Sequence, residues 1–441
     1  MLRSASLVLI AFFISVNCCS QDIFKIIGGQ ESYAMPFKLI NNLIIIPVEV
    51  NGSELNFLLD TGVNNTIMFN LSVSDSLKLR NIEQIRLRGL GEGYYMDAIK
   101  STKNKFRIGK IVNGYHMIYL ISGKEFDLST NLGVNIYGII GGDLFHDFIV
   151  DINYSTKRLK FYKPANYVYK KCKKCQTFEL DFYKNKPYID LVVQSKDTIK
   201  TKVKLLIDSG ASDALWLFEK SSKKIKIPEN HFIDFLGKGL SGNIYGKRSK
   251  IDKIIIGDYI FNDANVSYPD SSSIGSVYKH KERNGTIGSE LLKRFRVIFD
   301  YPSKKITFKK KSKHFNTPFL YNMSGIELSY SGEMLVREKQ SSFVEGSNKG
   351  GNTTAVEIIY NYVYAFKQSY QISVIRKDSP AHKAGLLLGD VVLQVNGKPA
   401  YTYKMQEIIH MFSVKEGKKI NLLVDRSGEV LSYSFKLEKM L

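Results

Sequence analysis

The sequence repeats itself once, and this duplication constrains its fold more than any other feature. The first copy carries Asp-Thr-Gly at residues 60–62, and the second carries Asp-Ser-Gly at 208–210, each directly after an apolar run. An Ile-Gly pair ending at Gly141 recurs at Gly288. The two aspartates lie 148 residues apart and the two Ile-Gly glycines 147 apart. Because two distant motifs keep nearly one spacing, we expect duplicated lobes related by approximate two-fold symmetry.

Both copies consist mostly of short β-prone runs separated by Gly, Asn and Asp, with few helical patterns. Gly-rich turns at residues 89–93 and 239–242 follow the two aspartates at similar distances, which predicts one hairpin tip in each lobe. The sequence therefore predicts a mainly β protein. Its two pseudo-symmetric lobes are expected at 21–165 and 166–315, with a separate α+β domain at 316–441.

The paired motifs point to two carboxyl groups that act together. Hydrolysis of a peptide bond by water needs one carboxylate to remove a proton and one protonated carboxyl to donate one. Two carboxyls held close share a proton because both cannot ionise together. Hydroxyls are expected to bridge the two loops, and glycines are expected to permit close approach and to brace them. These supporting residues are Thr61, Ser209, Gly62, Gly210, Gly141 and Gly288.

On these motifs the sequence resembles the pepsin/retropepsin group of aspartic peptidases, specifically exported bacterial members that carry a PDZ domain. The resemblance implies an aspartic-type endopeptidase in which Asp60 and Asp208 form the catalytic pair with an activated water. It implies no metal and no cofactor, and no obligate dimer, because both motifs lie in one chain. It also implies flaps over a peptide cleft, with candidates at Gly89, Gly91, Tyr94, Tyr95, Gly239, Gly242 and Tyr245.

The sequence departs from the pepsin pattern after each motif. Val63 and Ala211 stand where pepsin-like members often place a hydroxyl that acidifies the aspartate. Without that donor the pair keeps a higher pKa, which predicts activity at mildly acidic to neutral pH. The alternative is an inactive peptide-binding scaffold that retains the fold. The two hypotheses differ in whether both aspartates face one cleft.

A different pattern follows a basic linker that ends at residue 313. Ser-Pro-Ala at 379–381, Ala-Gly-Leu at 384–386 and Asn-Gly at 396–397 resemble bacterial PDZ domains. Such domains bind an extended peptide as an added strand. The expected peptide-binding residues are Tyr370, Gln371 and Ile372, although this segment lacks the family's usual glycines, so a purely structural domain stays open. Residues 341–354, rich in Ser, Gly and Asn, predict a mobile insertion.

The N-terminus has the pattern of a secretory signal, with an early Arg3, an apolar run and small residues before residue 21. Cleavage after Ser20 is expected, which predicts a periplasmic, cell-surface or secreted protein. Only Cys172 and Cys175 would then remain, and a local disulfide is the leading interpretation in an oxidising compartment. An unpaired or structural cysteine pair is the alternative.

The formal net charge of +21 raises nucleic acid or an anionic surface as partners. The lysines are scattered along the whole chain, so nucleic acid is not expected, whereas an anionic cell surface is kept as a partner beside peptide or protein substrates. A serine protease is disfavoured, because no Gly-x-Ser-x-Gly motif occurs and the seven histidines show no triad-like context. His146 is interpreted as satisfied locally rather than as a metal ligand.

Overall fold

The computed structural model describes residues 22–69, 77–87, 90, 95–121, 128–196, 198–275, 282–310, 312–346 and 355–441. The expected signal segment lies outside these residues, as do Gly89, Gly91 and Tyr94. No helix in the described ranges is both long and apolar enough to cross a membrane.

The first lobe is built on a nine-stranded sheet. Its strands are β1 (Lys25–Ile26), β3 (Lys38–Ile40), β4 (Leu43–Val50), β5 (Ser53–Leu59), β6 (Thr66–Met68), β7 (Ile82–Leu87), β8 (Met96–Ile108), β9 (Ile111–Ile121) and β10 (Gly138–Ile140). The β4–β5 turn has positive φ angles at Asn51 and Gly52 (50° and 99°), as a two-residue hairpin turn requires. Helix α1 (Ser129–Leu132) precedes β10, and α2 (Gly142–Asp147) follows it.

The second lobe repeats this plan on an eight-stranded sheet. Its strands are β14 (Asp181–Tyr183), β15 (Lys186–Gln194), β16 (Lys200–Ile207), β17 (Leu215–Leu217), β18 (Phe232–Gly239), β19 (Gly242–Ile256), β20 (Tyr259–Pro269) and β21 (Arg283–Ile287). Short 3-10 turns lie at Pro164–Asn166 and Glu219–Ser221, and helix α3 (Ser289–Leu292) corresponds to α2. Strand β10 runs parallel to β5, and β21 runs parallel to β16. The matching topology gives the expected pseudo-symmetric, mainly β fold.

A six-stranded antiparallel sheet joins the lobes. Its order is β13 (Cys175–Glu179), β23 (Lys305–Lys309), β22 (Arg296–Asp300), β11 (Ile149–Asn153), β12 (Arg158–Tyr162) and β2 (Ser32–Pro36). At its centre Val150 pairs with Phe299 and Ile152 with Val297, and all four side chains are buried. One hydrophobic core therefore runs through both lobes, which fixes their relative position.

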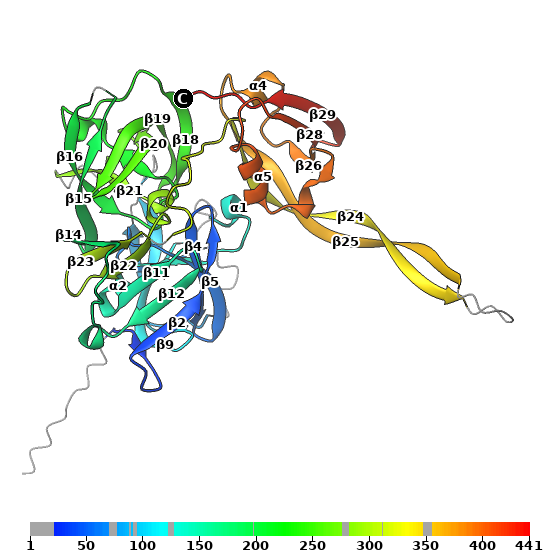
Figure 1. The fold of residues 1–441 in the computed structure, drawn as a ribbon. Helices are drawn as coiled ribbons and strands as arrows, with labels where there is room; N and C mark the ends of the chain where they lie inside the picture. Colours follow the sequence, from blue (N-terminus) through cyan, green and yellow to red (C-terminus); the bar gives the residue numbers. More distant parts are fainter. Residues whose placement is uncertain are drawn as a thin grey trace, which may run out of the picture.

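The C-terminal domain has its own sheet and core. The strands are β24 (Ile326–Gly346), β25 (Ala355–Ile375), β26 (Val391–Val395), β27 (Lys398–Pro399), β28 (Lys419–Arg426) and β29 (Glu429–Lys436). Helices α4 (Pro380–Lys383) and α5 (Met405–Met411) and a 3-10 turn at Ala400–Thr402 complete it. Figure 1 shows this domain beside both lobes, with β24 and β25 projecting as a long arm.

The structure describes only part of the insertion predicted at 341–354, and its mobility stays a prediction. Residues 341–346 continue strand β24, and strand β25 begins at Ala355, so the described part of this segment is extended hairpin rather than loop. Residues 347–354 lie outside the described ranges. The Ser, Gly and Asn content of 341–354 favours a loop. The β-branched and aromatic residues that follow position 355 favour a strand instead.

Candidate active site

Each aspartate follows the last residue of a buried strand. Asp60 follows β5 and its amide donates to the Ile140 carbonyl (2.9 Å), while Asp208 follows β16 and donates to the Ile287 carbonyl (3.0 Å). The strands that carry these isoleucines, β10 and β21, lie beside β5 and β16 in parallel register. The same local topology therefore presents both carboxyls at the boundary between the lobes.

Two hydroxyls tie the aspartate loops to each other. The Thr61 amide donates to Ser209 Oγ (3.0 Å), and the Ser209 amide donates to Thr61 Oγ1 (2.9 Å). Thr61 Oγ1 in turn donates to the Ile207 carbonyl (2.8 Å), and Ser209 Oγ donates to the Leu59 carbonyl (2.9 Å). Both side chains are at most 1% exposed, so four buried backbone groups depend on these two hydroxyls.

We expect Thr61→Val and Ser209→Ala each to destabilise the protein by about 2–4 kcal/mol. Each change leaves one buried N–H and one buried C=O without a partner, and a buried unsatisfied group costs about 1–3 kcal/mol. Urea unfolding measures the loss. Ser222→Ala is the control, because the Ser222 hydroxyl only accepts an exposed amide hydrogen bond. Losses no larger than the control's would show that the cross-lobe bonds are not needed for stability.

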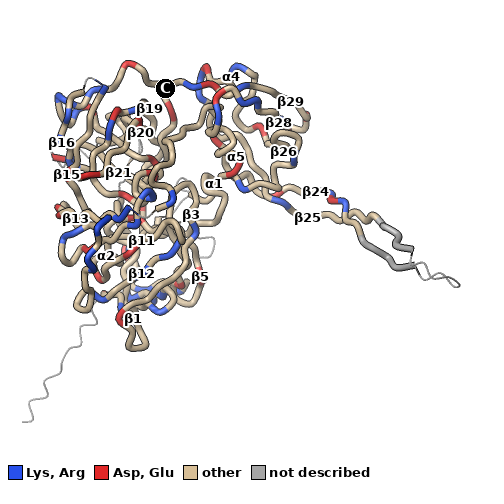
Figure 2. The backbone as a smooth tube through the Cα atoms, in the orientation of Figure 1, with Lys and Arg blue, Asp and Glu red and all other residues tan. Residues whose placement is uncertain are grey.

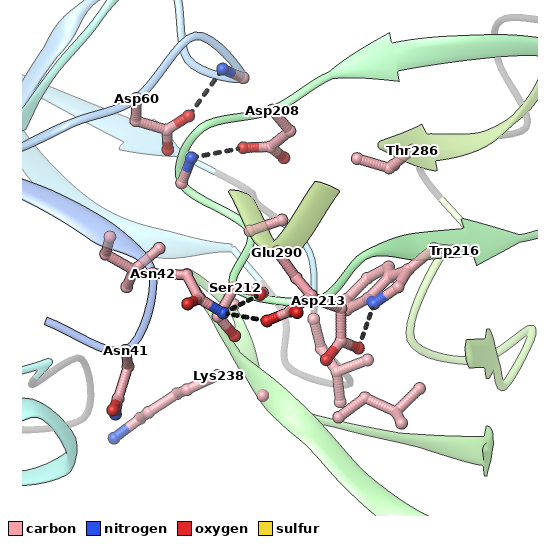
Figure 3. A pocket seen from close by; sticks show the side chains of 18 of the residues that line it. Asn41, Asn42, Asp60, Asp208, Ser212, Asp213, Trp216, Lys238, Thr286 and Glu290 are labelled. Atoms are coloured by element: carbon pink, nitrogen blue, oxygen red, sulfur yellow. Dashed lines mark hydrogen bonds between the residues drawn. The ribbon is translucent and has the colours of Figure 1, made fainter. Parts of the chain in front are cut away.

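The motif glycines allow the carboxyls to face each other. A Cβ on Gly62 would lie 2.7 Å from Asp208 Cγ, and a Cβ on Gly210 would lie 2.2 Å from Asp60 Oδ2. Each carboxylate instead accepts a hydrogen bond from the glycine amide of its own loop, at 2.6 Å for Gly62 and 2.9 Å for Gly210. Figure 3 shows Asp60 and Asp208 side by side with these two bonds.

The bracing glycines lie under the loops. A Cβ on Gly141 would be 2.0 Å from the Asp60 carbonyl oxygen, and one on Gly288 would be 2.4 Å from the Asp213 carbonyl oxygen. The amides after them also bond to the loops, because Gly142 donates to the Val63 carbonyl at 2.9 Å and Ser289 to the Ala211 carbonyl at 2.7 Å. The Ile-Gly segments thus support both aspartate loops from below.

The surroundings of Asp60 shift the pKa of its carboxyl. Burial raises the pKa of Asp60 well above its usual value, and the negative charge of Asp208 and a hydrogen bond with it raise it further. The Gly62 amide and the positive charge of Lys186 act in the opposite direction on this pKa. The environment of Asp60 therefore favours its protonated form.

Both aspartates line a single cavity of about 1290 Å³ that reaches both lobes and the C-terminal domain. Val63 and Ala211, which follow the motifs, also line it. The arrangement places two facing carboxyls in the lining of a space large enough for an extended peptide.

Each lobe has a hairpin whose tip residue packs against the other lobe. Leu90, from the tip between β7 and β8, packs with a second-lobe cluster that contains Trp216, while Leu240 of the β18–β19 tip packs with a first-lobe cluster that contains Leu58. The Ser241 amide donates to the Leu90 carbonyl (2.8 Å). The second-lobe tip therefore contacts Leu90 of the first lobe, and Leu90 and Leu240 both line the cavity.

The described flap candidates differ in position. Gly239 and Gly242 pair at the end of the second-lobe hairpin, and a Cβ on Gly239 would lie 2.2 Å from the Leu90 carbonyl oxygen. Tyr245 lines the cavity with its ring 5.7 Å from that of Phe235. Tyr95 is 62% exposed and is not among the residues that line the cavity.

The prediction that Tyr370, Gln371 and Ile372 bind peptide is wrong. Tyr370 and Gln371 pair with β24 on one side and β26 on the other, and the Ile372 amide donates to the Asp390 carbonyl (2.9 Å). Tyr370 and Ile372 are also each 1% exposed. A strand with partners on both sides cannot accept a peptide as a third neighbour, so these residues are structural.

The edge strand nearest the peptidase lobes is β24, which contacts helix α5. Helix α1 of the first lobe also lies against β24, and Gln406 Nε2 of α5 donates to the Leu132 carbonyl (2.8 Å). Ile409 and His410 of α5 line the same cavity as the aspartates. The C-terminal domain therefore contributes helix α5 to the lining of this cavity.

A charged network links the second aspartate loop to the C-terminal domain. Arg248 pairs with Asp213 and with Asp234, both at 2.9 Å, and Arg376 approaches Asp234 at 3.5 Å. Asp234 lies on β18, the first strand of the second-lobe hairpin. Burial raises the pKa of Glu327, which faces this network from β24, to about 7.

One histidine does have triad-like connections, contrary to the sequence-based expectation. His116 lies 2.7 Å from Thr66 Oγ1 and 3.0 Å from Asp22 Oδ1. Thr66 and His116 are 0% and 1% exposed, so no substrate reaches them. His146 packs against the rings of Phe182 and Tyr301, and burial lowers its pKa.

Cys172 and Cys175 form the predicted local disulfide. Within the described ranges, no three His, Cys, Asp or Glu side chains are grouped to hold a metal ion.

Sequence reasoning missed two cations beside the aspartates. Lys186 and Arg283 both line the cavity from the second lobe, and both interact electrostatically with Asp208. The strand register brings Lys186 to the site, because the first residue of β15 falls opposite Asp208 when the Tyr188–Leu206 pairing is extended. Neither cation lies near Asp60 or Asp208 in the sequence, so no local pattern marks it.

Two family models match the chain. Residues 46–144 match the aspartyl protease family, and residues 371–426 match the PDZ domain. A probable CtpA-like serine protease of Staphylococcus saprophyticus subsp. saprophyticus is 36% identical over 70 residues, which is 16% of this chain and 14% of that protein. The chain therefore matches the aspartyl protease family in its first lobe and carries a PDZ domain at its C-terminus.

Proposed function

We propose that the protein is an aspartic-type endopeptidase that hydrolyses peptide bonds with Asp60 and Asp208. The observation that carries this proposal is the facing pair of carboxyls at the floor of one cavity, held by reciprocal bonds between the lobes. A non-catalytic scaffold has no need for a buried carboxyl whose pKa is raised further by a second carboxyl that faces it.

The roles of the two carboxyls follow from their environments. Asp208, when ionised, removes a proton from a water molecule between the carboxyls, and the water attacks the peptide carbonyl. Asp60, kept protonated by burial and by Asp208, donates to the carbonyl oxygen. The proton taken by Asp208 then passes to the leaving nitrogen as the C–N bond breaks, and the hydroxyl formed from the carbonyl oxygen returns its proton to the carboxyl pair.

The second part of the proposal is that the PDZ domain holds peptide or protein segments near the cleft. Its helix α5 lines the cavity, and it is bonded to the first lobe through Gln406 and to the second through Arg376. We further propose that the protein is exported. The signal-like N-terminus and the Cys172–Cys175 disulfide support an oxidising location.

Incubation of the protein with a peptide library tests the proposal, with cleavage read by mass spectrometry. Cleavage is expected, and an active-site-directed inhibitor of aspartic peptidases should block it, whereas a serine-protease reagent should not. Cleavage that resists the first inhibitor and is stopped by the second would overturn the aspartic mechanism.

The maximum of kcat/KM is expected at mildly acidic to neutral pH. Activity needs one carboxyl ionised and one protonated, and it falls as the pair loses its second proton. The raised pKa of Asp60 moves this alkaline limb upward, toward neutral pH. A pH profile on one cleaved peptide checks this. A maximum at about pH 3, midway between the pKa values of the pepsin pair, would contradict it.

A further inference from the structure

The pseudo-symmetry of the lobes permits a direct comparison of the two cavity walls. The register Ile45–Leu58 places Leu43 opposite Asp60, and the register Tyr188–Leu206 places Lys186 opposite Asp208. Side chains opposite each other on antiparallel strands lie on the same face of the sheet. Leu43 and Lys186 are therefore equivalent neighbours of the two aspartates, one apolar and one cationic.

The difference extends over both walls. Ile139 pairs with Ile67 in the first lobe, and at the equivalent positions Thr286 pairs with Trp216 in the second. Leu43, Ile67 and Ile139 belong to one buried apolar cluster that lines the cavity. Figure 3 shows Thr286 on the same side of the site as Asp208. Beside the aspartates the first wall is therefore apolar, whereas the second, called the polar wall here, carries Lys186 and Thr286 next to Trp216.

Arg283 adds a second cation to the polar wall. It is 8% exposed, and its guanidinium donates to the Gly285 carbonyl (3.1 Å) and to Thr286 Oγ1 (2.6 Å). It also bonds with Tyr188 and lies over the Phe218 ring. All four partners are uncharged. In the described part of the chain, neither Arg283 nor Lys186 forms an ion pair with a carboxylate.

The charges around the aspartates do not balance. The pair shares one proton in its active form, so it carries one negative charge beside two cations. The other acids that line the cavity have partners: Asp213 and Asp234 both pair with Arg248 (2.9 Å), Glu290 pairs with Lys293 (2.9 Å), and Glu327 accepts from Asn322 Nδ2 (3.4 Å). A buried cation without an anion is costly. One negative charge is thus missing from this wall. Figure 2 shows that Lys and Arg otherwise occur on both lobes and on the PDZ domain.

We propose that the wall formed by Lys186 and Arg283 is a subsite for a carboxylate side chain of the substrate, next to the bond that is cleaved. Successive side chains of an extended peptide point to opposite sides. One residue beside the cleaved bond then meets the apolar wall of Leu43, and its neighbour meets Lys186. The favoured substrate has an apolar residue and an Asp or Glu across the cleaved bond. This inference rests on the proposed peptidase activity.

Matched peptides test the subsite. A peptide that the library shows to be cleaved is made in two versions, which differ only in having Glu or Gln at the position that faces the polar wall. The ratio of kcat/KM for Glu over Gln is expected to be about 10- to 100-fold, as for a hydrogen bond to a charged group. The ratio should fall as pH drops below about 4.3, where the substrate glutamate becomes protonated.

Lys186→Met should reduce this ratio to near unity. Lys200→Met is the matched control, because it removes the same charge from an exposed position at the start of β16 and should keep the wild-type ratio. If Lys186→Met lowers cleavage of both peptides equally, Lys186 acts on the aspartate pair and the subsite is wrong. A wild-type ratio near unity also overturns the subsite but leaves the peptidase proposal intact. The absence of any cleavage would instead overturn the proposed function.

Discussion

Replacement of either Asp60 or Asp208 with asparagine is expected to lower kcat/KM for peptide cleavage by about 100- to 10,000-fold. An amide can neither take a proton from water nor share one with the facing carboxyl. Both variants should fold, because the asparagine side chain has the same shape and its oxygen can still accept from the Gly62 or Gly210 amide. Steady-state kinetics on one peptide, with circular dichroism as a folding check, measure the effect.

Asp190→Asn is the control for this experiment. Asp190 lies on β15, close in sequence to Lys186, but its side chain is exposed and pairs with Lys202 (3.1 Å). The same chemical change there should leave kcat/KM unaltered. Folded Asp60 or Asp208 variants with activity equal to this control's would show that the chemistry lies elsewhere.

The lobes were predictable because duplication leaves a signal that is independent of secondary-structure propensity. Two motifs at nearly one spacing require two similar units, and an apolar run before each aspartate requires a buried strand there. The cross-lobe bonds of Thr61 and Ser209 follow from the same symmetry. The six-stranded sheet between the lobes was not predictable, because no local pattern encodes which strand of one lobe pairs with which strand of the other.

The C-terminal domain shows where local patterns fail. Its Asn396-Gly397 turn and its helix after Ser379 follow from residue chemistry, and both are present, with Ser379 Oγ accepting from the His382 amide. The peptide-binding segment was misassigned because the sequence marks a strand at 370–372 but not the number of its neighbours. Only the sheet order shows that β25 is an inner strand and that β24 and β29 lie at the edges of this sheet.

The site was partly predictable for a physical reason. The groups that touch the aspartates from their own loops lie within two residues of them, so the motif contains them. Lys186 and Arg283 reach the site through strand pairing, and Leu90 and Leu240 reach it by crossing between lobes. Long-range contacts of this kind leave no trace in one sequence, so the electrostatic asymmetry of the cleft required the structure.

Gly210→Ala is expected to reduce kcat by about 100-fold or more although no reacting group changes. The added Cβ would lie 2.2 Å from Asp60 Oδ2 and 2.3 Å from Asp60 Cγ, so the carboxyl of Asp60 must move away from Asp208. Displacement of a catalytic group by about 1 Å can cost 100-fold in rate. The φ angle of Gly210 is not in the left-handed region, so alanine fits the backbone and the effect comes from the Cβ alone.

The matched control is Gly114→Ala, since a Cβ there meets no atom within 4 Å and its φ is also ordinary. This control should keep the activity and stability of the wild type. Gly62→Ala should resemble Gly210→Ala but with a smaller loss, because its Cβ would approach Asp208 Cγ only to 2.7 Å. Steady-state measurement of kcat on one peptide ranks the three variants by activity. If Gly210→Ala folds and keeps the activity of Gly114→Ala, close approach of the two carboxyls is not required, and the shared-proton mechanism fails with it.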